Sequence, residues 1–328
     1  MKYCLVLGCM GLFVTFSTAA DEAPLRLGLI GLDTSHVIIF TQIVNDPAHS
    51  EHVPGGRVVA AYKGGSDDVE ASYTRIDGFT ERLQTEFGVE IVDTIEELCE
   101  MVDAILLTSV DGRVHLEQAR PVFEAGKIVY IDKPLAGSLE DAKAIVALGN
   151  KHNVPWFTSS AYRFYESLQE LKRADVGEVR GAISYGPCHL EPNHPDLFWY
   201  GIHPTEALYT IMGTGCEVVT CAVTDEFHVV TGVWSGGRVG TLYGLRTGAA
   251  PNKVIVFGSK AVAEQQPGAS YAPLVAEIMN FFRTGQAPVP PEESLELFAF
   301  MEAAHESIRR GGAPVRLDEL LSSPAEAE

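Results

Sequence analysis

The sequence predicts an α/β protein in two parts: a doubly wound parallel sheet, then an α+β domain with a mostly antiparallel, open-faced sheet. Between residues 25 and 160, short apolar runs alternate with amphipathic stretches of helical length, which favours parallel strands joined by helices. After residue 160, apolar runs with period-two alternation dominate, which favours antiparallel strands. We therefore place the domains at residues 25–160 and 161–322, with a disordered tail at 323–328.

Composition excludes one large class of partners. The chain has 328 residues, of which 46% are hydrophobic and 21% charged, as in a globular protein large enough for two cores. The formal net charge is -20, and the sequence has no basic tract. Binding to a phosphate backbone needs clustered Lys and Arg, so we expect no nucleic-acid partner.

The first twenty residues have the pattern of a secretory signal peptide. Lys2 precedes an apolar run at residues 5–16, and small residues follow before acidic Asp21. We expect residues 1–20 to be removed and the protein to be exported to the periplasm or beyond. The apolar run is too short for a stable membrane span. An alternative interpretation takes Cys9 as a lipoprotein cleavage site.

Four of the six cysteines follow the predicted signal peptide. An oxidising compartment permits a disulfide among them, and the sequence leaves the pairing open. Their spacing matches no zinc module. These residues are Cys99, Cys188, Cys216 and Cys221.

The elements of the first part alternate as a doubly wound sheet requires. Strands are predicted at residues 25–30, 57–62, 104–108, 128–131 and 155–159. Helices are predicted at residues 37–45, 80–87, 93–101, 114–125 and 138–152. A capping box at residues 93–96 begins the third of these helices, and Gly126 ends the fourth.

The second part is richer in strands. Strands are predicted at residues 179–185, 217–224, 229–234, 238–245 and 253–257. Gly236 and Gly237 indicate a tight hairpin between two of them. Helices are predicted at residues 165–174, 271–283 and 293–310.

The predicted strand at residues 128–131 ends in Asp132, Lys133 and Pro134. Proline has no backbone donor and disfavours helical geometry in the preceding residue, so strand pairing should stop there. Ligands of open α/β sheets lie at this edge, and we expect the Lys133 ammonium to point into an interdomain cleft. The alternative is a solvated lysine at a strand end.

The turn after the first strand has the outline of a dinucleotide-binding loop but lacks two of its glycines. Gly31 fits the first glycine, whereas Asp33 and His36 occupy the second and third positions. A carboxylate repels a pyrophosphate, and a side chain at the second position crowds it. Asp33, Thr34 and Ser35 could instead cap the helix that follows.

A polar cluster between residues 186 and 206 concentrates candidate groups in the second part. His203 begins an apolar helical pattern and Glu206 follows one turn later on the same face. Such a histidine can act as a general base or be a buried, hydrogen-bonded core residue. His189, Glu191 and His194 could bind a divalent metal or contact a substrate, although their spacing matches no familiar metal motif.

Four motifs, taken together, are similar to one family. They are residues 130–135 around Lys133, residues 111–115, residues 159–164, and Gly201-Ile202-His203. Together they resemble the Gfo/Idh/MocA oxidoreductases, the family of glucose-fructose oxidoreductase and inositol dehydrogenase. The most specific motif is usually Glu-Lys-Pro in the family and begins with Asp132 here. The resemblance covers nearly the whole chain after the predicted signal peptide.

The resemblance implies a Rossmann domain, a C-terminal open-faced sheet that forms homo-oligomers, and oxidation of a sugar or cyclitol hydroxyl with NAD or NADP. It implies that Lys133 orients the hydroxyl and His203 removes its proton. The expected cofactor contacts are Gly31, Asp33, Thr34, Ser35, His36, Thr108 and Asp132. The expected substrate contacts are Tyr162, Arg163, His189, His194, Trp199 and Glu206.

The chain departs from the family pattern in two places. The glycine loop is altered, and the aspartate four residues before the histidine is Trp199, so the usual partner of the base is absent. Two alternatives therefore stay open. One is a lyase, hydrolase or epimerase acting on keto-sugars without a nicotinamide, with or without a divalent metal. The other is a non-catalytic carbohydrate-binding protein, in which aromatic residues such as Trp199 and Tyr200 stack on a sugar.

Overall fold

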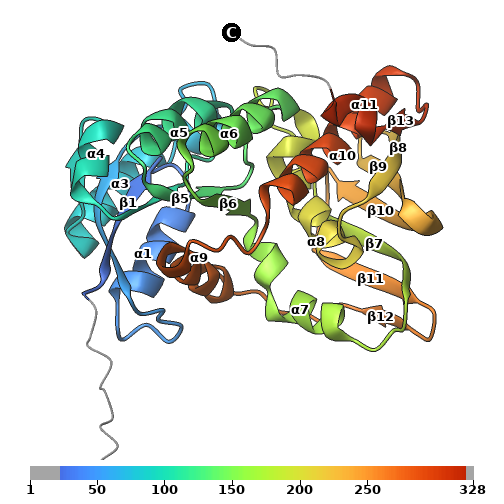
Figure 1. Cartoon of the computed structure of the whole chain (residues 1–328), viewed down its shortest axis with the longest axis horizontal. Coiled ribbons are helices and arrows are strands. Elements are labelled where there is room, and N and C mark those ends of the chain that lie inside the picture. The colour runs from blue at the N-terminus through green and yellow to red at the C-terminus, as the bar shows by residue number, and fades with distance from the viewer. Residues whose placement is uncertain (1–22, 323–328) are drawn as a thin grey trace, which may run out of the picture.

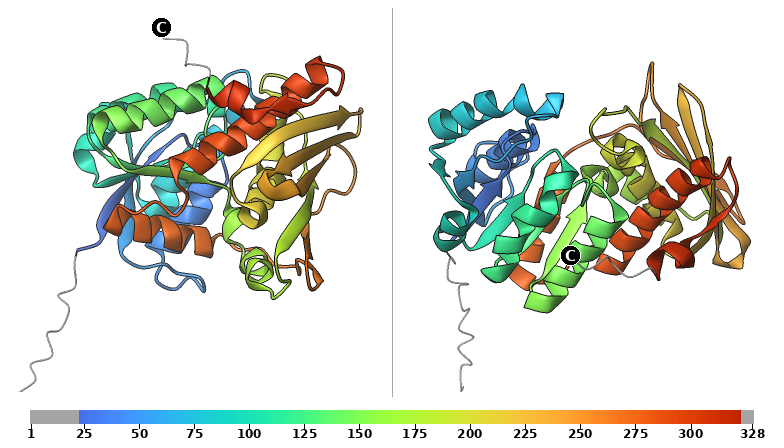
Figure 2. Two further views of the ribbon diagram at one scale, coloured as in Figure 1. Left: turned by 45° about the vertical axis from the view of Figure 1, so that its right-hand side comes forward. Right: turned by 90° about the horizontal axis from the view of Figure 1, so that it is seen from above.

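A computed structural model describes residues 23–322 of the chain (Figure 1). The predicted signal peptide and the predicted tail lie outside these residues. The described part contains a parallel sheet with helices on both faces and a second, mostly antiparallel sheet with helices on one face (Figures 1 and 2). This architecture confirms the predicted fold class. The domain boundaries and the disordered tail stay predictions.

The parallel sheet has six strands in the order β3-β2-β1-β4-β5-β6. Its strands are β1 (Leu25–Ile30), β2 (Gly56–Tyr62), β3 (Glu90–Val92), β4 (Ala104–Leu107), β5 (Ile128–Asp132) and β6 (Trp156–Ser159). The strand order reverses between β1 and β4, and every neighbouring pair is parallel. Doubly wound sheets bind ligands at the carboxyl ends of the strands beside this reversal.

Helices bury both faces of the parallel sheet. On one face lie α1 (His36–Asn45) and α3 (Ile76–Phe87), with Phe40 and Leu83 in the core. On the other face lie α4 (Ile95–Met101), α5 (His115–Glu124) and α6 (Leu139–His152). The fully buried strands explain the continuous apolar runs in this part of the sequence.

Several boundaries differ from the predicted ones. The hydroxyl of Thr94 accepts a hydrogen bond from Glu97 N at 3.1 Å, so the capping box lies one residue later than predicted. Helix α3 begins at Ile76, before the predicted start at Thr80. The short elements β3 and α2 (Glu70–Tyr73) were not predicted, because so few residues show no period.

The second sheet has seven strands in the order β12-β11-β7-β10-β9-β8-β13. The strands are β7 (Val179–Pro187), β8 (Cys216–Val223), β9 (Phe227–Trp234), β10 (Arg238–Leu245), β11 (Lys253–Gly258), β12 (Val262–Glu264) and β13 (Val315–Arg316). Only β7 and β10 pair in parallel among these strands; the other pairs are antiparallel. Gly236 and Gly237 lie between β9 and β10 with positive φ, at the predicted hairpin.

Helices cover one face of this sheet and leave the other open. The inner face packs against α7 (Glu166–Arg173), α8 (Ile202–Met212) and α10 (Pro291–Arg309). The outer face exposes apolar side chains along β9, β10 and β11, among them Phe227, Val233, Val239, Tyr243 and Phe257. In the described residues no helix combines the length and apolarity that a membrane crossing requires.

The chain returns to the first sheet near its end. Helix α9 (Ala272–Thr284) packs beside α1, and Leu274, Ile278 and Phe281 are buried with the residues of β1 (Figure 2). The core of the parallel sheet is therefore completed by residues far beyond residue 160.

Candidate active site

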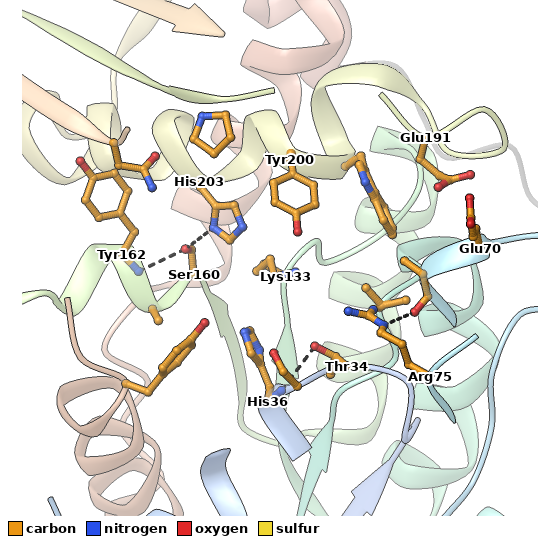
Figure 3. Close-up of a pocket in the computed structure, with 18 of the residues that line it drawn as sticks. Thr34, His36, Glu70, Arg75, Lys133, Ser160, Tyr162, Glu191, Tyr200 and His203 are labelled. Carbon is orange, nitrogen blue, oxygen red and sulfur yellow. Dashed lines mark hydrogen bonds between the residues drawn. The ribbon is translucent and has the colours of Figure 1, made fainter. Parts of the chain in front are cut away.

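A cavity of about 590 Å³ lies at the carboxyl edge of the parallel sheet, facing α8 (Figure 3). Pockets of this size suit small polar or apolar ligands. The lining residues are Thr34, Ser35, His36, Glu70, Ala71, Thr74, Arg75, Val110, Lys133, Ser160, Ala161, Tyr162, Tyr165, Pro187, Glu191, Trp199, Tyr200, His203, Asn252 and Tyr271.

Lys133 reaches the cavity from the end of β5, at the edge predicted from the sequence. Asp132 accepts a hydrogen bond from Lys133 N at 2.8 Å, which fixes the backbone where the strand stops. The peptide bond between Lys133 and Pro134 is cis. Lys133 is 8% exposed, so its ammonium faces the cavity rather than bulk solvent.

His203 lines the cavity from the first turn of α8. Its Nδ1 lies 2.7 Å from the hydroxyl oxygen of Ser160, which follows β6. Burial lowers the pKa of His203 to about 3, and the nearby Lys133 and His36 add to this effect. The ring is therefore neutral at neutral pH.

Two of the predicted substrate contacts lie behind the cavity wall. Arg163 is buried between two carboxylates, with Nε 3.3 Å from Glu206 and NH1 2.7 Å from Glu293. Glu206 also accepts a hydrogen bond from Ser160 N. Neither Arg163 nor Glu206 lines the cavity. A network of this kind holds the backbone of Ser160 in place, and through Ser160 it positions His203.

The substituted third glycine position carries an ordered imidazole. His36 Nδ1 is hydrogen-bonded to Asp132 Oδ2. The ring stacks on Phe40, with ring centroids 5.2 Å apart, and makes an edge contact with Tyr271, with ring centroids 5.0 Å apart. Burial raises the pKa of Asp132, but His36 and Lys133 outweigh this effect and lower the pKa to about 2.

The glycine turn is closed by the chain's own atoms. Gly31 has a φ of +82°, and a Cβ there would lie 2.0 Å from Ser109 Oγ, so only glycine fits. Gly31 N donates to Tyr62 O at 3.1 Å, and Thr108 donates its hydroxyl proton to Gly31 O at 2.9 Å. Asp33 is fully buried. The predicted cofactor contacts Gly31, Asp33, Thr108 and Asp132 do not line the cavity, whereas Thr34, Ser35 and His36 do.

Residues 64–75, which we call the covering segment, pack on this turn. Asp33 accepts hydrogen bonds from Val110 N at 2.9 Å and from Ser72 Oγ at 2.7 Å. Burial raises the pKa of Asp33. Val69 is fully buried against Val110 and Trp199. The second glycine position thus carries a buried carboxylate that is hydrogen-bonded within the chain.

The predicted metal candidates do not converge on one point. His189 is exposed, with Nδ1 3.0 Å from Arg246 O. His194 is buried, which lowers its pKa to about 4, and it lies beside Trp199. Of these candidates Glu191 alone lines the cavity, so the predicted substrate contacts His189 and His194 lie outside it.

A different group satisfies the spacing for a metal among residues 23–322. Ligand atoms of Cys188, Asp196 and His228 lie within 4.8 Å of one another. Arg246 Nη2 lies 3.2 Å from Asp196 and 2.8 Å from His228 Nε2, so a guanidinium already lies against two members of this group. The residues therefore do not suit a further cation. The cysteines at 99, 188, 216 and 221 are all free and buried.

Of the remaining predicted substrate contacts, Tyr162 and Trp199 do line the cavity. Sequence reasoning missed Arg75, Asn252 and Tyr271, which come from three distant segments. Ser160 lies within the motif at residues 159–164, but no role was predicted for it. Its hydroxyl group close to the predicted site residue Tyr162 is the signal that could have identified it.

Comparison with known proteins supports a family assignment. Residues 45–160 match the oxidoreductase family with an NAD-binding Rossmann fold, Gfo/Idh/MocA. A Streptococcus pneumoniae protein described as an oxidoreductase is 23% identical over 192 residues, 53% of this chain and 52% of its own length. Inositol 2-dehydrogenase 3 of Saccharopolyspora erythraea is 33% identical over 101 residues, 30% of this chain and 29% of its own. The chain thus spans about half, or less, of the curated relatives that it matches.

The fold is shared over a greater length. Scyllo-inositol dehydrogenase from Lactobacillus casei, solved with NAD(H) and scyllo-inositol, superposes with a TM-score of 0.72 at 15% identity. That comparison covers 90% of this chain and 99% of the other. Residues 45–160 thus match the Gfo/Idh/MocA oxidoreductase family, and the described part of the chain shares its two-sheet fold with a scyllo-inositol dehydrogenase.

Proposed function

We propose that this protein acts on a sugar or cyclitol, with Lys133 orienting an oxygen of the substrate and His203 exchanging a proton with it. The observation that carries the proposal is the convergence of an ammonium and a neutral imidazole in one cavity (Figure 3). The relative named inositol 2-dehydrogenase supports a polyhydroxylated ring as the substrate class.

The two groups suit complementary tasks. An ammonium offers three donors and stabilises negative charge that develops on a substrate oxygen. His203 has Nδ1 engaged by Ser160, which leaves Nε2 to exchange a proton with the substrate. Tyr200 lies beside His203, with ring centroids 5.6 Å apart, and offers an aromatic face to an apolar side of a sugar ring.

In the oxidoreductase form of the proposal, hydride transfer to NAD or NADP accompanies the proton transfer. The family match at residues 45–160 supports this form, and the cavity reaches the start of α1 at Thr34 and Ser35. The glycine turn itself does not suit a dinucleotide, because Asp33 places a buried carboxylate at the second glycine position, where it is hydrogen-bonded to Val110 and to the covering segment. A nicotinamide would have to bind in a pose that avoids Gly31 and Asp33.

The closed turn favours a second candidate, a lyase or epimerase that acts on a keto-sugar without a nicotinamide. Lys133 would then hold the oxygen of an enolate instead of an alkoxide. Both candidates need Lys133 and His203, and they differ only in whether a hydride leaves the substrate.

One set of measurements separates the two candidates. Quenching of tryptophan fluorescence by NADH or NADPH at up to millimolar concentration tests for cofactor binding. Turnover of myo-inositol, scyllo-inositol and 2-keto-myo-inositol is then followed with and without cofactor. We expect Lys133→Met and His203→Gln to lower turnover by about a hundredfold or more. Lys63→Met, at an exposed lysine paired with Asp77, is the matched control. Unchanged turnover in Lys133→Met would reject the proposed roles.

We also propose that the protein is exported and that it forms homo-oligomers through its second sheet. The signal pattern at residues 1–20 supports export. Sequencing the N-terminus of protein recovered from the periplasm or medium should give a start near residue 21, and a chain that still begins at Met1 would contradict it.

A further inference from the structure

Two departures from the family pattern touch each other. The third glycine position is His36, and the acid before the lysine is Asp132. These residues are 96 positions apart, yet His36 Nδ1 is hydrogen-bonded to Asp132 Oδ2. The imidazole at the third glycine position is thus hydrogen-bonded to the carboxylate that precedes the lysine.

The orientation of the His36 ring is fixed on several sides. Asp132 is 1% exposed and holds Nδ1, while Phe40 and Tyr271 pack on the ring. Tyr130 donates its hydroxyl proton to the other oxygen of Asp132 at 3.1 Å, so the carboxylate is itself held in place. A histidine whose ring is fixed by packing and a carboxylate is prepared for proton transfer.

The hydrogen bond also determines which ring nitrogen carries a proton. Asp132 is ionised, because its pKa is lowered to about 2 despite burial. A carboxylate only accepts hydrogen bonds, so Nδ1 of His36 is the donor, and Nε2 is the ring nitrogen left to contact a ligand. A carboxylate that orients an imidazole in this way is the arrangement used by general-base histidines.

The ring faces the other polar groups of the cavity. Figure 3 shows His36 pointing up from α1 and His203 pointing down from α8, with Lys133 between them. All three line the same cavity, and Lys133 and His36 are both close enough to His203 to lower its pKa. A small ligand that touches Lys133 is within the space that His36 borders.

We infer that His36, oriented by Asp132, is a catalytic base that removes a carbon-bound proton from a keto-sugar or keto-cyclitol in this cavity. The inference rests on the proposed function of Lys133 and His203 and names a substrate class for their site. It also explains how a closed glycine turn and an active cavity coexist, since proton transfer needs no hydride acceptor.

The step is an enolisation in which atoms and electrons balance. His36 Nε2 takes the proton from the carbon next to the carbonyl, and the electron pair of that bond forms a carbon–carbon double bond. The carbonyl π pair moves to oxygen, where Lys133 and the neutral His203 hydrogen-bond the enolate. Return of the proton from His36 restores the ketone, and no oxidant or reductant takes part.

Exchange with solvent deuterium tests the step without knowledge of the net reaction. The protein is incubated in D₂O with 2-keto-myo-inositol or a 3-keto-hexopyranoside, and loss of the C–H signal beside the carbonyl is followed by proton NMR. We expect exchange with the unaltered protein, and a rate lower by about a hundredfold or more in His36→Gln. His49→Gln, at a histidine whose Nδ1 accepts only a local bond from Glu51 N, should exchange at the unaltered rate.

A second variant guards against misfolding. Asp132→Asn keeps a hydrogen-bonding group next to His36 but can donate to it, which favours the wrong tautomer and should also slow exchange. Thermal unfolding monitored by circular dichroism identifies any variant that has lost its fold.

The outcomes are distinguishable. Exchange that persists in both His36→Gln and Asp132→Asn but is lost in Lys133→Met overturns the role of His36 and leaves the proposed function standing. Absence of exchange in the unaltered protein, together with cofactor-dependent turnover of a cyclitol, overturns it in favour of the oxidoreductase form. Absence of both exchange and turnover overturns the inference and the proposed function together.

Discussion

Ser160 provides His203 with the hydrogen-bond partner that is missing because residue 199 is tryptophan. In the family pattern an aspartate four residues before the histidine partners the base, and here Trp199 packs into an apolar cluster with Val69 and Val110. The ring of His203 is held instead by Ser160 Oγ at 2.7 Å. A hydroxyl can donate or accept, so it orients the imidazole without placing a second negative charge in the cavity.

Removing this hydroxyl should weaken catalysis more than binding. In Ser160→Ala, His203 loses its Nδ1 partner, and we expect kcat to fall about tenfold to a hundredfold with little change in KM, as for other residues that orient a reacting group. Steady-state kinetics on the substrate identified above measures both constants. Ser160→Thr, which restores a hydroxyl, should recover part of kcat, and Ser235→Ala at an exposed turn should change nothing. Equal losses in Ser160→Thr and Ser160→Ala would contradict an orienting role.

The burial of His203 makes stability depend on pH. Its pKa is lowered to about 3 in the folded protein, against about 6.5 in an unfolded chain. Between these two pH values the His203 side chain binds a proton in the unfolded state but not in the folded state. The free energy of unfolding therefore rises with pH in this range and falls as the solution is acidified. His194, with a pKa near 4, acts in the same direction.

We expect His203→Gln to flatten this dependence. Between pH 4 and pH 5.5 the slope of unfolding free energy against pH should decrease by about 1.4 kcal/mol per pH unit, the value for one proton. Urea unfolding at several pH values measures the slope. A variant with the slope of the unaltered protein would show that His203 takes up protons equally in the folded and unfolded states.

At the level of elements, the connection between β1 and α1 is tightly packed. Gly31 has positive φ and lies against Ser109, while the covering segment adds Gly64, whose added Cβ would lie 3.3 Å from Gly31 Cα. Gly31 and Asp33 of this connection are therefore internal packing contacts, whereas Thr34 and Ser35 line the cavity.

Two glycine substitutions separate conformational strain from crowding. Gly31→Ala should lower the free energy of unfolding by about 3 kcal/mol or more, because it combines an unfavourable φ with overlap on the Ser109 backbone. Gly126→Ala has a similar φ of +67° and no atom within 4 Å of the added Cβ, so it should lose only about 1–2 kcal/mol. Chemical denaturation of both variants gives the comparison, and equal losses would mean that the packing on Gly31 is loose.

At the level of the whole molecule, the outer face of the second sheet exposes a group of apolar side chains. Val239 and Tyr243 are 43% and 41% exposed on β10, and Val233 and Phe227 flank them on β9. Exposed apolar faces of this kind mark protein interfaces, which is consistent with the proposed homo-oligomer.

Charges placed on this face should keep the chain monomeric. Light scattering coupled to size exclusion should give at least twice the chain mass for the unaltered protein and the mass of one chain for a Val239→Lys, Tyr243→Lys double variant. Leu321→Lys, at an exposed apolar residue outside this face, is the control. A monomeric unaltered protein at micromolar concentration would contradict the proposal.

The sequence predicted those site residues whose position follows from their neighbours in the chain, and it did not predict contacts between distant residues. Lys133 was predicted to face a cleft, because a strand end followed by proline is a local pattern. The contact between His36 and Asp132 was not predicted, because the two residues are 96 positions apart in the sequence. Arg163 and Glu206 were expected in the cavity because spacing reveals polar residues but not the direction in which they point. Their burial depends on Glu293, which comes from another helix.

The return of α9 makes the two halves of the chain dependent on each other for folding. Leu274, Ile278 and Phe281 complete a core that begins at β1, so residues 25–160 alone would leave the part of this core that packs against α9 exposed. A truncated chain that ends before Ala272 should therefore aggregate rather than form an isolated nucleotide-binding domain. Because this core joins residues more than 200 positions apart, folding must await nearly the entire chain and should be slow for a protein of this size.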